Sequence, residues 1–119
     1  MSGMELRYRE LARANVSSFV FHYEEAILSL YRDTGIWSED FMLRGVAENA
    51  NQLFGDIFDT VERQLNPNVI LGRKKLRSNM YELSFYLGSR LVVVYYSEDK
   101  QKKVRWVESI SINRKPIIF

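Results

Sequence analysis

Cysteine is absent from this 119-residue chain, and histidine occurs once, at His22. The absence of cysteine excludes disulfides, thiol catalysis and zinc-thiolate sites, and it is consistent with a reducing cytoplasm, where we expect the protein to act. A single histidine gives little support for a metal site. The sequence also lacks a Walker-type phosphate loop, a dinucleotide-binding glycine pattern and a serine-nucleophile elbow. We therefore predict neither a metal nor a cofactor.

Long hydrophobic runs are also absent. The longest apolar run, Leu91 to Tyr96, is far too short to span a bilayer. The segment from Met1 to Asn15 has no apolar stretch of the kind found in a signal peptide. We therefore expect no membrane association.

Positive charge is scarce in the first half of the chain and negative charge is scarce in the second, and no lysine precedes Lys74. Residues 1–66 carry six Arg or Lys against eleven Asp or Glu, whereas residues 67–119 carry eleven against four. The change falls at Asn66-Pro67, where a helical pattern gives way to a strand pattern. We predict one domain over residues 1–119, with an acidic helical half and a basic β half. Such segregation bears on the partners of a protein rather than on its fold.

The first helices are marked by apolar spacing. Met4 to Ala14 is predicted to form a short helix that stops at Asn15. A spacing of three to four residues then favours a helix from about Ser18 to Asp33, ended by Thr34-Gly35. The aromatic and β-branched residues of Ser18 to Tyr23 could equally open this segment as a strand.

A third helix is the best-marked element. Ser38 is a good N-cap, and Trp37 before it is placed to pack on Met42 as a hydrophobic staple. Asn66-Pro67 ends the helix, because proline has no amide hydrogen and disfavours helix in the residue before it. Its apolar stripe comprises Leu43, Val46, Ala50, Leu53, Ile57, Val61 and Leu65.

After the third helix the apolar period changes to two, which predicts strands. Tyr81 to Leu87 is a half-buried strand, and Arg90 to Ser97, apolar on both faces, is a central strand. Lys103 to Ile112 is the third strand, and its expected apolar side consists of Val104, Trp106, Ile110 and Ile112. The predicted fold is α+β, with two or three N-terminal helices packed on one face of a three-stranded antiparallel sheet.

Gly88-Ser89 matches a two-residue hairpin with glycine in the first turn position, and this turn fixes a register. The register places Arg90 and Tyr95 on opposite faces of one strand, because their separation is odd. We expect Tyr95 on the functional face. The predicted pairs are Leu87 with Arg90, Phe85 with Val92, Leu83 with Val94 and Glu82 with Tyr95.

Basic residues gather in and after the loop that precedes the sheet. They comprise Arg73, Lys74, Lys75, Arg77, Arg90, Lys100, Lys102, Lys103, Arg105, Arg114 and Lys115, with Tyr81, Tyr86, Tyr95, Tyr96 and Trp106 interleaved. Cations bind phosphates and aromatic faces stack unpaired bases, which indicates a surface that faces RNA or the ribosome. Alternatively, the tyrosines are sheet core and the lysines keep a hairpin edge soluble. If they bind RNA, Arg73, Lys75, Arg90 and Arg105 should form one continuous patch.

The chain resembles the RelE/ParE superfamily of bacterial toxins over roughly residues 38–116. The resemblance is carried by the helical hairpin, the basic loop, the strand with Tyr81-Glu82-Leu83, the strand from Arg90 to Tyr95 and the final basic cluster. It implies a small α+β protein, either a ribosome-dependent mRNA endonuclease or a gyrase poison, neutralised by a bound antitoxin. The family's first strand would fall around Phe19 to Phe21.

The resemblance also implies roles for individual residues. The positions matched to catalytic roles are Lys74, Lys75, Tyr95 and Arg114, and those matched to nucleic-acid binding are Arg73, Arg77, Arg90 and Lys115. Arg105 is assigned to nucleic-acid binding because it belongs to the basic cluster on the sheet.

Two functions remain open from the sequence, and whether the protein is an enzyme stays undecided. One is a toxin-like endoribonuclease that acts on RNA or the ribosome through a basic β face and is held by an antitoxin. The other is a non-enzymatic inhibitor that binds a protein target, such as an immunity protein or a phage-encoded inhibitor of host defence.

Overall fold

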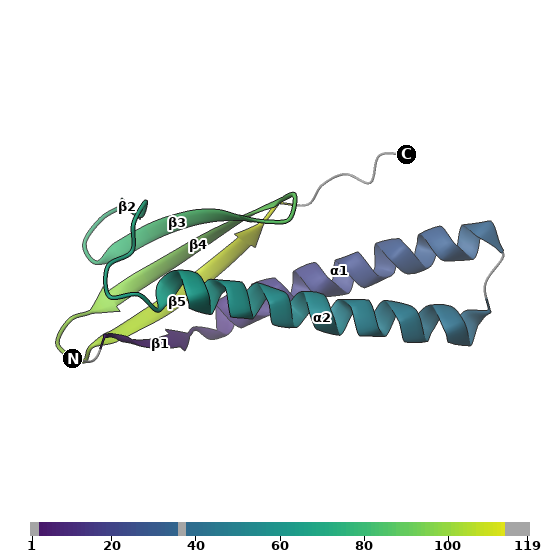
Figure 1. Cartoon of the computed structure of the whole chain (residues 1–119), viewed down its shortest axis with the longest axis horizontal. Coiled ribbons are helices and arrows are strands. Elements are labelled where there is room, and N and C mark those ends of the chain that lie inside the picture. The colour runs from purple at the N-terminus through teal and green to yellow at the C-terminus, as the bar shows by residue number, and fades with distance from the viewer. Residues whose placement is uncertain (1–2, 36–37, 114–119) are drawn as a thin grey trace.

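The structure, a computed structural model, describes residues 3–35 and 38–113. It contains two helices and one five-stranded sheet of strand order β1-β5-β4-β3-β2 (Figure 1). The elements are β1 (Glu5–Tyr8), α1 (Glu10–Thr34), α2 (Glu39–Leu65), β2 (Lys74–Lys75), β3 (Met80–Leu87), β4 (Arg90–Asp99) and β5 (Val104–Ile112). The α+β class is confirmed. The predicted three-stranded antiparallel sheet is incomplete, because β2 extends it at one edge and β1 adds a parallel strand at the other.

The predicted helix from Met4 to Ala14 is wrong in its first half. Glu5–Tyr8 forms β1, which pairs in parallel with β5, and the amide of Glu5 donates to the carbonyl of Lys103 at 2.8 Å. Leu6 and Tyr8 pack against the core, while Glu5 and Arg7 are exposed. This alternation is the two-residue period of a strand. β1 has only four residues, which is too few for this period to be distinguished from a helical pattern in the sequence.

The predicted stop at Asn15 is also wrong, because α1 continues through it to Thr34. The Asn15 side chain does not cap a helix end; its Oδ1 accepts a hydrogen bond from the amide of Ile110 on β5 at 3.0 Å. The strand expected around Phe19 to Phe21 is therefore absent, and this segment is helical. The predicted end is confirmed, with Gly35 in the left-handed region at φ 65°.

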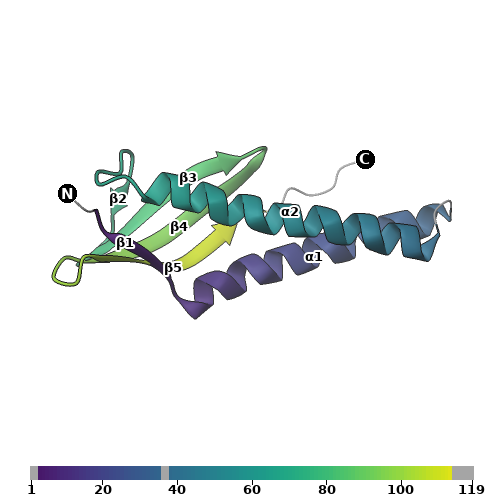
Figure 2. The ribbon, with the colours of Figure 1, turned by 60° about the horizontal axis from the view of Figure 1, so that its bottom comes forward.

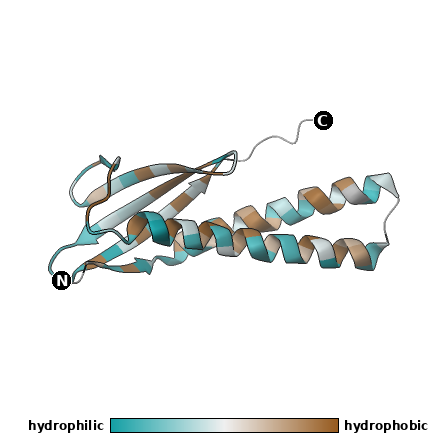
Figure 3. Cartoon of the chain, in the orientation of Figure 1, coloured by the Kyte–Doolittle hydropathy of each residue, from teal (hydrophilic) through white to brown (hydrophobic). Residues whose placement is uncertain are grey.

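The third predicted helix is confirmed as α2. The Ser38 hydroxyl accepts from the amide of Phe41 at 3.3 Å, and the helix ends at Leu65, before Asn66-Pro67. The proposed staple involves Trp37, which lies outside the described residues. The two helices pack antiparallel and extend well beyond the sheet, so the molecule is elongated at 57 × 24 × 20 Å (Figure 2). Figure 3 shows hydrophobic and hydrophilic residues interspersed along this projecting pair.

The hairpin of β3 and β4 has the predicted register, from Leu87 opposite Arg90 to Glu82 opposite Tyr95. Gly88 has φ 62°, as a two-residue turn of this kind requires. β4 is the central strand of the sheet, as predicted.

A β-bulge changes which side chains of β5 face the helices. Tyr95 pairs with Ser109 and Tyr96 pairs with Val107, so Glu108 is an extra residue on β5. The predicted grouping of Val104 and Trp106 with Ile110 and Ile112 is therefore wrong, because alternation is broken at the bulge. Arg105 and Val107 share the helix-covered face with Ile110 and Ile112.

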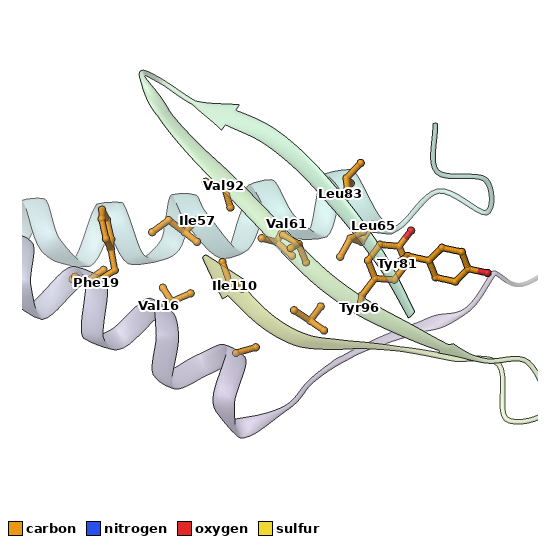
Figure 4. Close-up of a cluster of buried hydrophobic side chains, with 14 of the residues drawn as sticks. Val16, Phe19, Ile57, Val61, Leu65, Tyr81, Leu83, Val92, Tyr96 and Ile110 are labelled. Atoms are coloured by element: carbon orange, nitrogen blue, oxygen red, sulfur yellow. The ribbon is translucent and has the colours of Figure 1, made fainter. Parts of the chain in front are cut away.

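Both helices cover the same face of the sheet, as predicted (Figure 4). Val16 and Phe19 of α1 and Ile57, Val61 and Leu65 of α2 are buried in one cluster. The sheet supplies Tyr81, Leu83, Val92, Val94, Tyr96, Val107 and Ile110 to it. Burial of these apolar side chains is the main contribution to stability.

We predict that Tyr8→Phe will flatten the alkaline limb of the stability profile. The Tyr8 ring packs edge-on against Phe58 with centroids 5.2 Å apart, and its hydroxyl has no hydrogen-bond partner among the described residues. Burial, with a smaller contribution from Glu62, raises the pKa of Tyr8 to about 12 from 10.0. The folded state therefore keeps this proton between these pH values while the unfolded chain loses it, so its contribution to stability is complete below pH 10.0 and is lost as pH rises towards 12.

Urea unfolding of wild type and Tyr8→Phe at pH values from 8 to about 12 measures the difference in slope, which isolates Tyr8 from the other titrating groups. Equal slopes in the two proteins would show that the hydroxyl is not buried.

Candidate functional site

A buried ion pair lies where the sheet meets the end of α2. Arg105 is 2 % exposed, and its Nε and Nη2 donate to the Glu98 carboxylate at 3.0 and 2.8 Å. Its Nη1 donates to the carbonyl of Leu65, the last residue of α2, and to the carbonyl of Pro67 at 3.1 Å. A cation at a helix C-terminus satisfies carbonyls that have no partner within the helix and opposes the negative end of the helix dipole. Arg105 therefore holds α2 on the sheet.

Arg73 joins this pair from the loop before β2. Its Nη1 donates to the Glu98 carboxylate at 3.0 Å, and its guanidinium lies 3.9 Å from the ring centre of Tyr81. The Tyr81 ring stacks in turn on Tyr96 at 5.4 Å. Burial raises the pKa of the Tyr96 hydroxyl, and the neighbouring Arg73 opposes this shift. Both arginines thus have structural partners that sequence analysis missed. The turn after Asp99 brings Arg105 opposite Glu98, and this turn was the feature of the sequence that could have indicated the pair.

The prediction that Arg105 belongs to an exposed nucleic-acid surface is wrong, because the side chain is buried and paired. The expected continuous patch is also absent. Arg90 lies near the β3–β4 turn, where its guanidinium is 5.4 Å from the Tyr23 ring and 5.8 Å from the Phe19 ring. Arg73 lies at the other end of the sheet, beside Glu98.

The candidate catalytic residues divide between the two faces. Lys74 pairs with Glu82, which pairs with Tyr95, so these three side chains form one cross-strand row on the face away from the helices. Lys75 pairs with Tyr81 and points to the helix-covered side. Arg77 is exposed between β2 and β3. Arg114 and Lys115 lie outside the described residues.

Two hollows flank the Glu98 cluster. One, of about 300 Å³, has Arg73, Lys100, Lys103 and Arg105 in its lining. The other, of about 320 Å³, is lined by Lys75 and Tyr81 among others. Since Glu98 already engages both arginines, the exposed cations left in the first hollow are Lys100 and Lys103. Over residues 3–35 and 38–113, no group of three His, Cys, Asp or Glu side chains is placed to hold a metal.

The face of the sheet opposite the helices, here called the outer face, is an uncovered surface with aromatic side chains. Among the described residues, none of the helices packs on it (Figures 1 and 2). Its side chains are Tyr86, at 72 % exposure, with the partly exposed Leu91, Val93, Tyr95 and Trp106.

Charged side chains line the outer face on the side of β1. Arg9 lies over the Trp106 ring at 3.9 Å and Arg7 approaches it at 5.7 Å. Glu108, the bulged residue, accepts from Arg9 at 3.3 Å and from the Ser97 hydroxyl at 2.7 Å. A cation on an aromatic face contributes about 0.5–1 kcal/mol at an exposed site. The bulge thus fixes an ordered border of Arg, Trp and Glu, which the sequence analysis did not anticipate.

Comparison with protein-family models, with curated proteins and with solved structures finds no match for this chain. Within the described part of the chain, no helix is long and apolar enough to cross a membrane. The resemblance to RelE/ParE toxins therefore stays a prediction.

We predict that Glu98→Gln will strongly destabilise the fold. It removes the carboxylate that compensates Arg105, and breaking a buried pair in this way costs about 3–5 kcal/mol. Glu5→Gln is the matched control, because Glu5 pairs with Arg7 at 2.8 Å with both side chains about half exposed. Such exposed pairs contribute little. Urea denaturation compares the two, and a loss at Glu98 no larger than that at Glu5 would contradict the structural role of the cluster.

Proposed function

We propose that this chain is a non-enzymatic protein-binding protein that docks its partner on the outer face of the sheet. The observation that carries the proposal is this bare five-stranded face, which presents Tyr86, Tyr95 and Trp106 on rigid strands. Aromatic side chains and arginine are enriched at the energetic centres of protein interfaces. The candidate catalytic lysines, by contrast, point to opposite faces, which does not favour a single reaction centre.

The charges on the outer face indicate the surface chemistry of the partner. Arg7, Arg9 and Lys74 stand at its two sides, and Glu82 and Glu108 lie within it. A partner that fits would present an apolar centre bordered by acidic groups. An inhibited target protein and an antitoxin are both candidates for this partner.

We expect Val93→Arg to weaken partner binding without unfolding the protein, because Val93 is partly exposed near the centre of the outer face. A photo-crosslinking amino acid at Tyr95 should capture the partner, whereas the same group at Gln52, an exposed position on α2, should not. With the captured protein purified, Val93→Arg should weaken binding at least about tenfold, and Gln52→Arg should leave it unchanged. Folded Val93→Arg that binds as wild type would contradict the proposal.

A second candidate is the toxin-like, RNA-directed function. The observation that favours it is the cross-strand row of Lys74, Glu82 and Tyr95, which brings two candidate catalytic residues to one face. Positioned Lys and Tyr side chains can activate a 2′-hydroxyl and protonate a leaving oxygen without histidine. On this hypothesis the outer face binds RNA, and affinity falls steeply with salt.

Under the toxin hypothesis we expect expression of the wild-type chain in bacteria to arrest growth. Tyr95→Phe should relieve the arrest, because only a hydroxyl on the outer face is lost, and Lys74→Ala should do so too. Lys75→Ala is the matched control and should stay toxic, because Lys75 points to the other side of the sheet. Growth curves with circular dichroism of each variant test this. Harmless wild type, or toxicity unchanged in both Tyr95→Phe and Lys74→Ala, would leave protein binding as the function.

A further inference from the structure

The edge of β3 is open over its second half. β2 pairs with β3 only at Tyr81 and Glu82, and the amide of Leu76 then donates to the carbonyl of Met80 at 3.0 Å. In an antiparallel ladder, backbone groups of alternate residues point to the same neighbour. The N–H and C=O groups of Ser84 and Tyr86 therefore point towards the side that β2 leaves vacant. Figure 1 shows β3 continuing well past the end of β2.

This open segment lacks the features that usually block strand addition. β1, at the opposite edge, carries Glu5 and Arg7, and β2 consists of Lys74 and Lys75. Charged residues and proline on an edge strand prevent pairing with another chain. The stretch from Ser84 to Leu87 has neither. Of the three described edge segments, this one alone is chemically ready to accept a strand.

A groove lies at the end of the open edge, where Leu87 meets α2. It has a volume of about 480 Å³ and lies between α2 and the end of β3, lined by Asp56, Asp59, Thr60, Glu62, Arg63, Asn66 and Leu87. Its three carboxylates outnumber its one arginine, and Arg63 also donates to the Thr60 hydroxyl at 3.2 Å. The groove therefore offers a negative wall on α2 and an apolar end at Leu87.

We propose that the open edge of β3 binds an extended basic peptide segment of a partner protein, which adds as a sixth strand. Its backbone would pair with Ser84 and Tyr86. Since side chains alternate across a strand, every second one would enter the groove, where Lys or Arg meets Asp56 and Asp59. The remaining side chains would lie beside Tyr86 on the outer face. This site adjoins the proposed docking face at Tyr86, but it depends on the backbone edge of β3 and on α2, so either site can exist without the other.

Amide hydrogen exchange with a defined probe tests the proposal. The probe is an end-blocked heptapeptide of alternating Val and Lys, and its control carries Glu in place of Lys. At saturation the Lys peptide should slow exchange of the Ser84 and Tyr86 amides at least about tenfold and leave that of Phe85, already bonded to β4, unchanged. Unaltered exchange at both edge amides, or equal binding of the Glu peptide, would overturn the proposal.

Two sets of variants separate the contribution of backbone pairing to peptide binding from that of charge. Tyr86→Pro removes an N–H that the β3–β4 ladder does not use and should weaken the Lys peptide at least about tenfold, whereas Tyr86→Thr keeps the N–H and should bind nearly as wild type. Asp56→Asn with Asp59→Asn should weaken it as well, and Glu48→Gln, elsewhere on α2, should not. Full affinity in both the proline variant and the double Asn variant would refute the site. If, in the absence of peptide, protection of the Ser84 and Tyr86 amides increases with protein concentration, the edge instead binds a second copy of the chain.

Discussion

The pairing of Arg105 with Glu98 is the interaction on which the arrangement of the molecule depends. One guanidinium bonds the carboxylate on β4, the last carbonyl of α2 at Leu65 and the carbonyl of Pro67 beyond it, and so fixes where the long helix ends on the sheet. The same carboxylate anchors Arg73 and hence the loop that leads into β2. A buried charge pair of this kind adds little net stability over an apolar pair, because desolvation offsets much of its attraction, but the loss of one partner leaves the other charge buried alone.

The bulge at Glu108 is coupled to this cluster. Without the extra residue, Arg105 and Val107 would lie on the opposite face from Ile110, and Arg105 would point away from the end of α2. With it, Trp106 and Glu108 turn to the outer face, where Arg7 and Arg9 of the β1 region cover the indole. One local irregularity therefore supplies both the internal clamp and the charged border of the candidate docking surface.

Local signals accounted for much of the fold. The Ser38 cap, the end of α2 before Asn66-Pro67 and the Gly88-Ser89 turn are each encoded within a few neighbouring residues, and all three predictions are confirmed. β1 and the bulge could not be predicted in this way. The pairing of β1 with β5 joins residues about a hundred positions apart, and Asn15, which looks like a helix stop, is explained only by its bond to Ile110. Lys74 and Lys75 project to opposite faces of the sheet because they form a short strand, whereas the sequence placed them in a loop.

The strong positive charge of the second half of the chain also takes on a different meaning. Two of its arginines, Arg73 and Arg105, are held by one internal carboxylate, and Arg90 lies over aromatic rings of α1. The number of basic residues in this half therefore overstates the cations that a nucleic acid can contact, because Arg105 is buried and Arg73 is paired with Glu98. The acidic half behaves differently, since Asp56, Asp59 and Glu62 of α2 gather along a groove. The exposed charge is thus negative along the groove of α2, mixed on the outer face and positive at Lys100 and Lys103, so it is divided among separate parts of the surface.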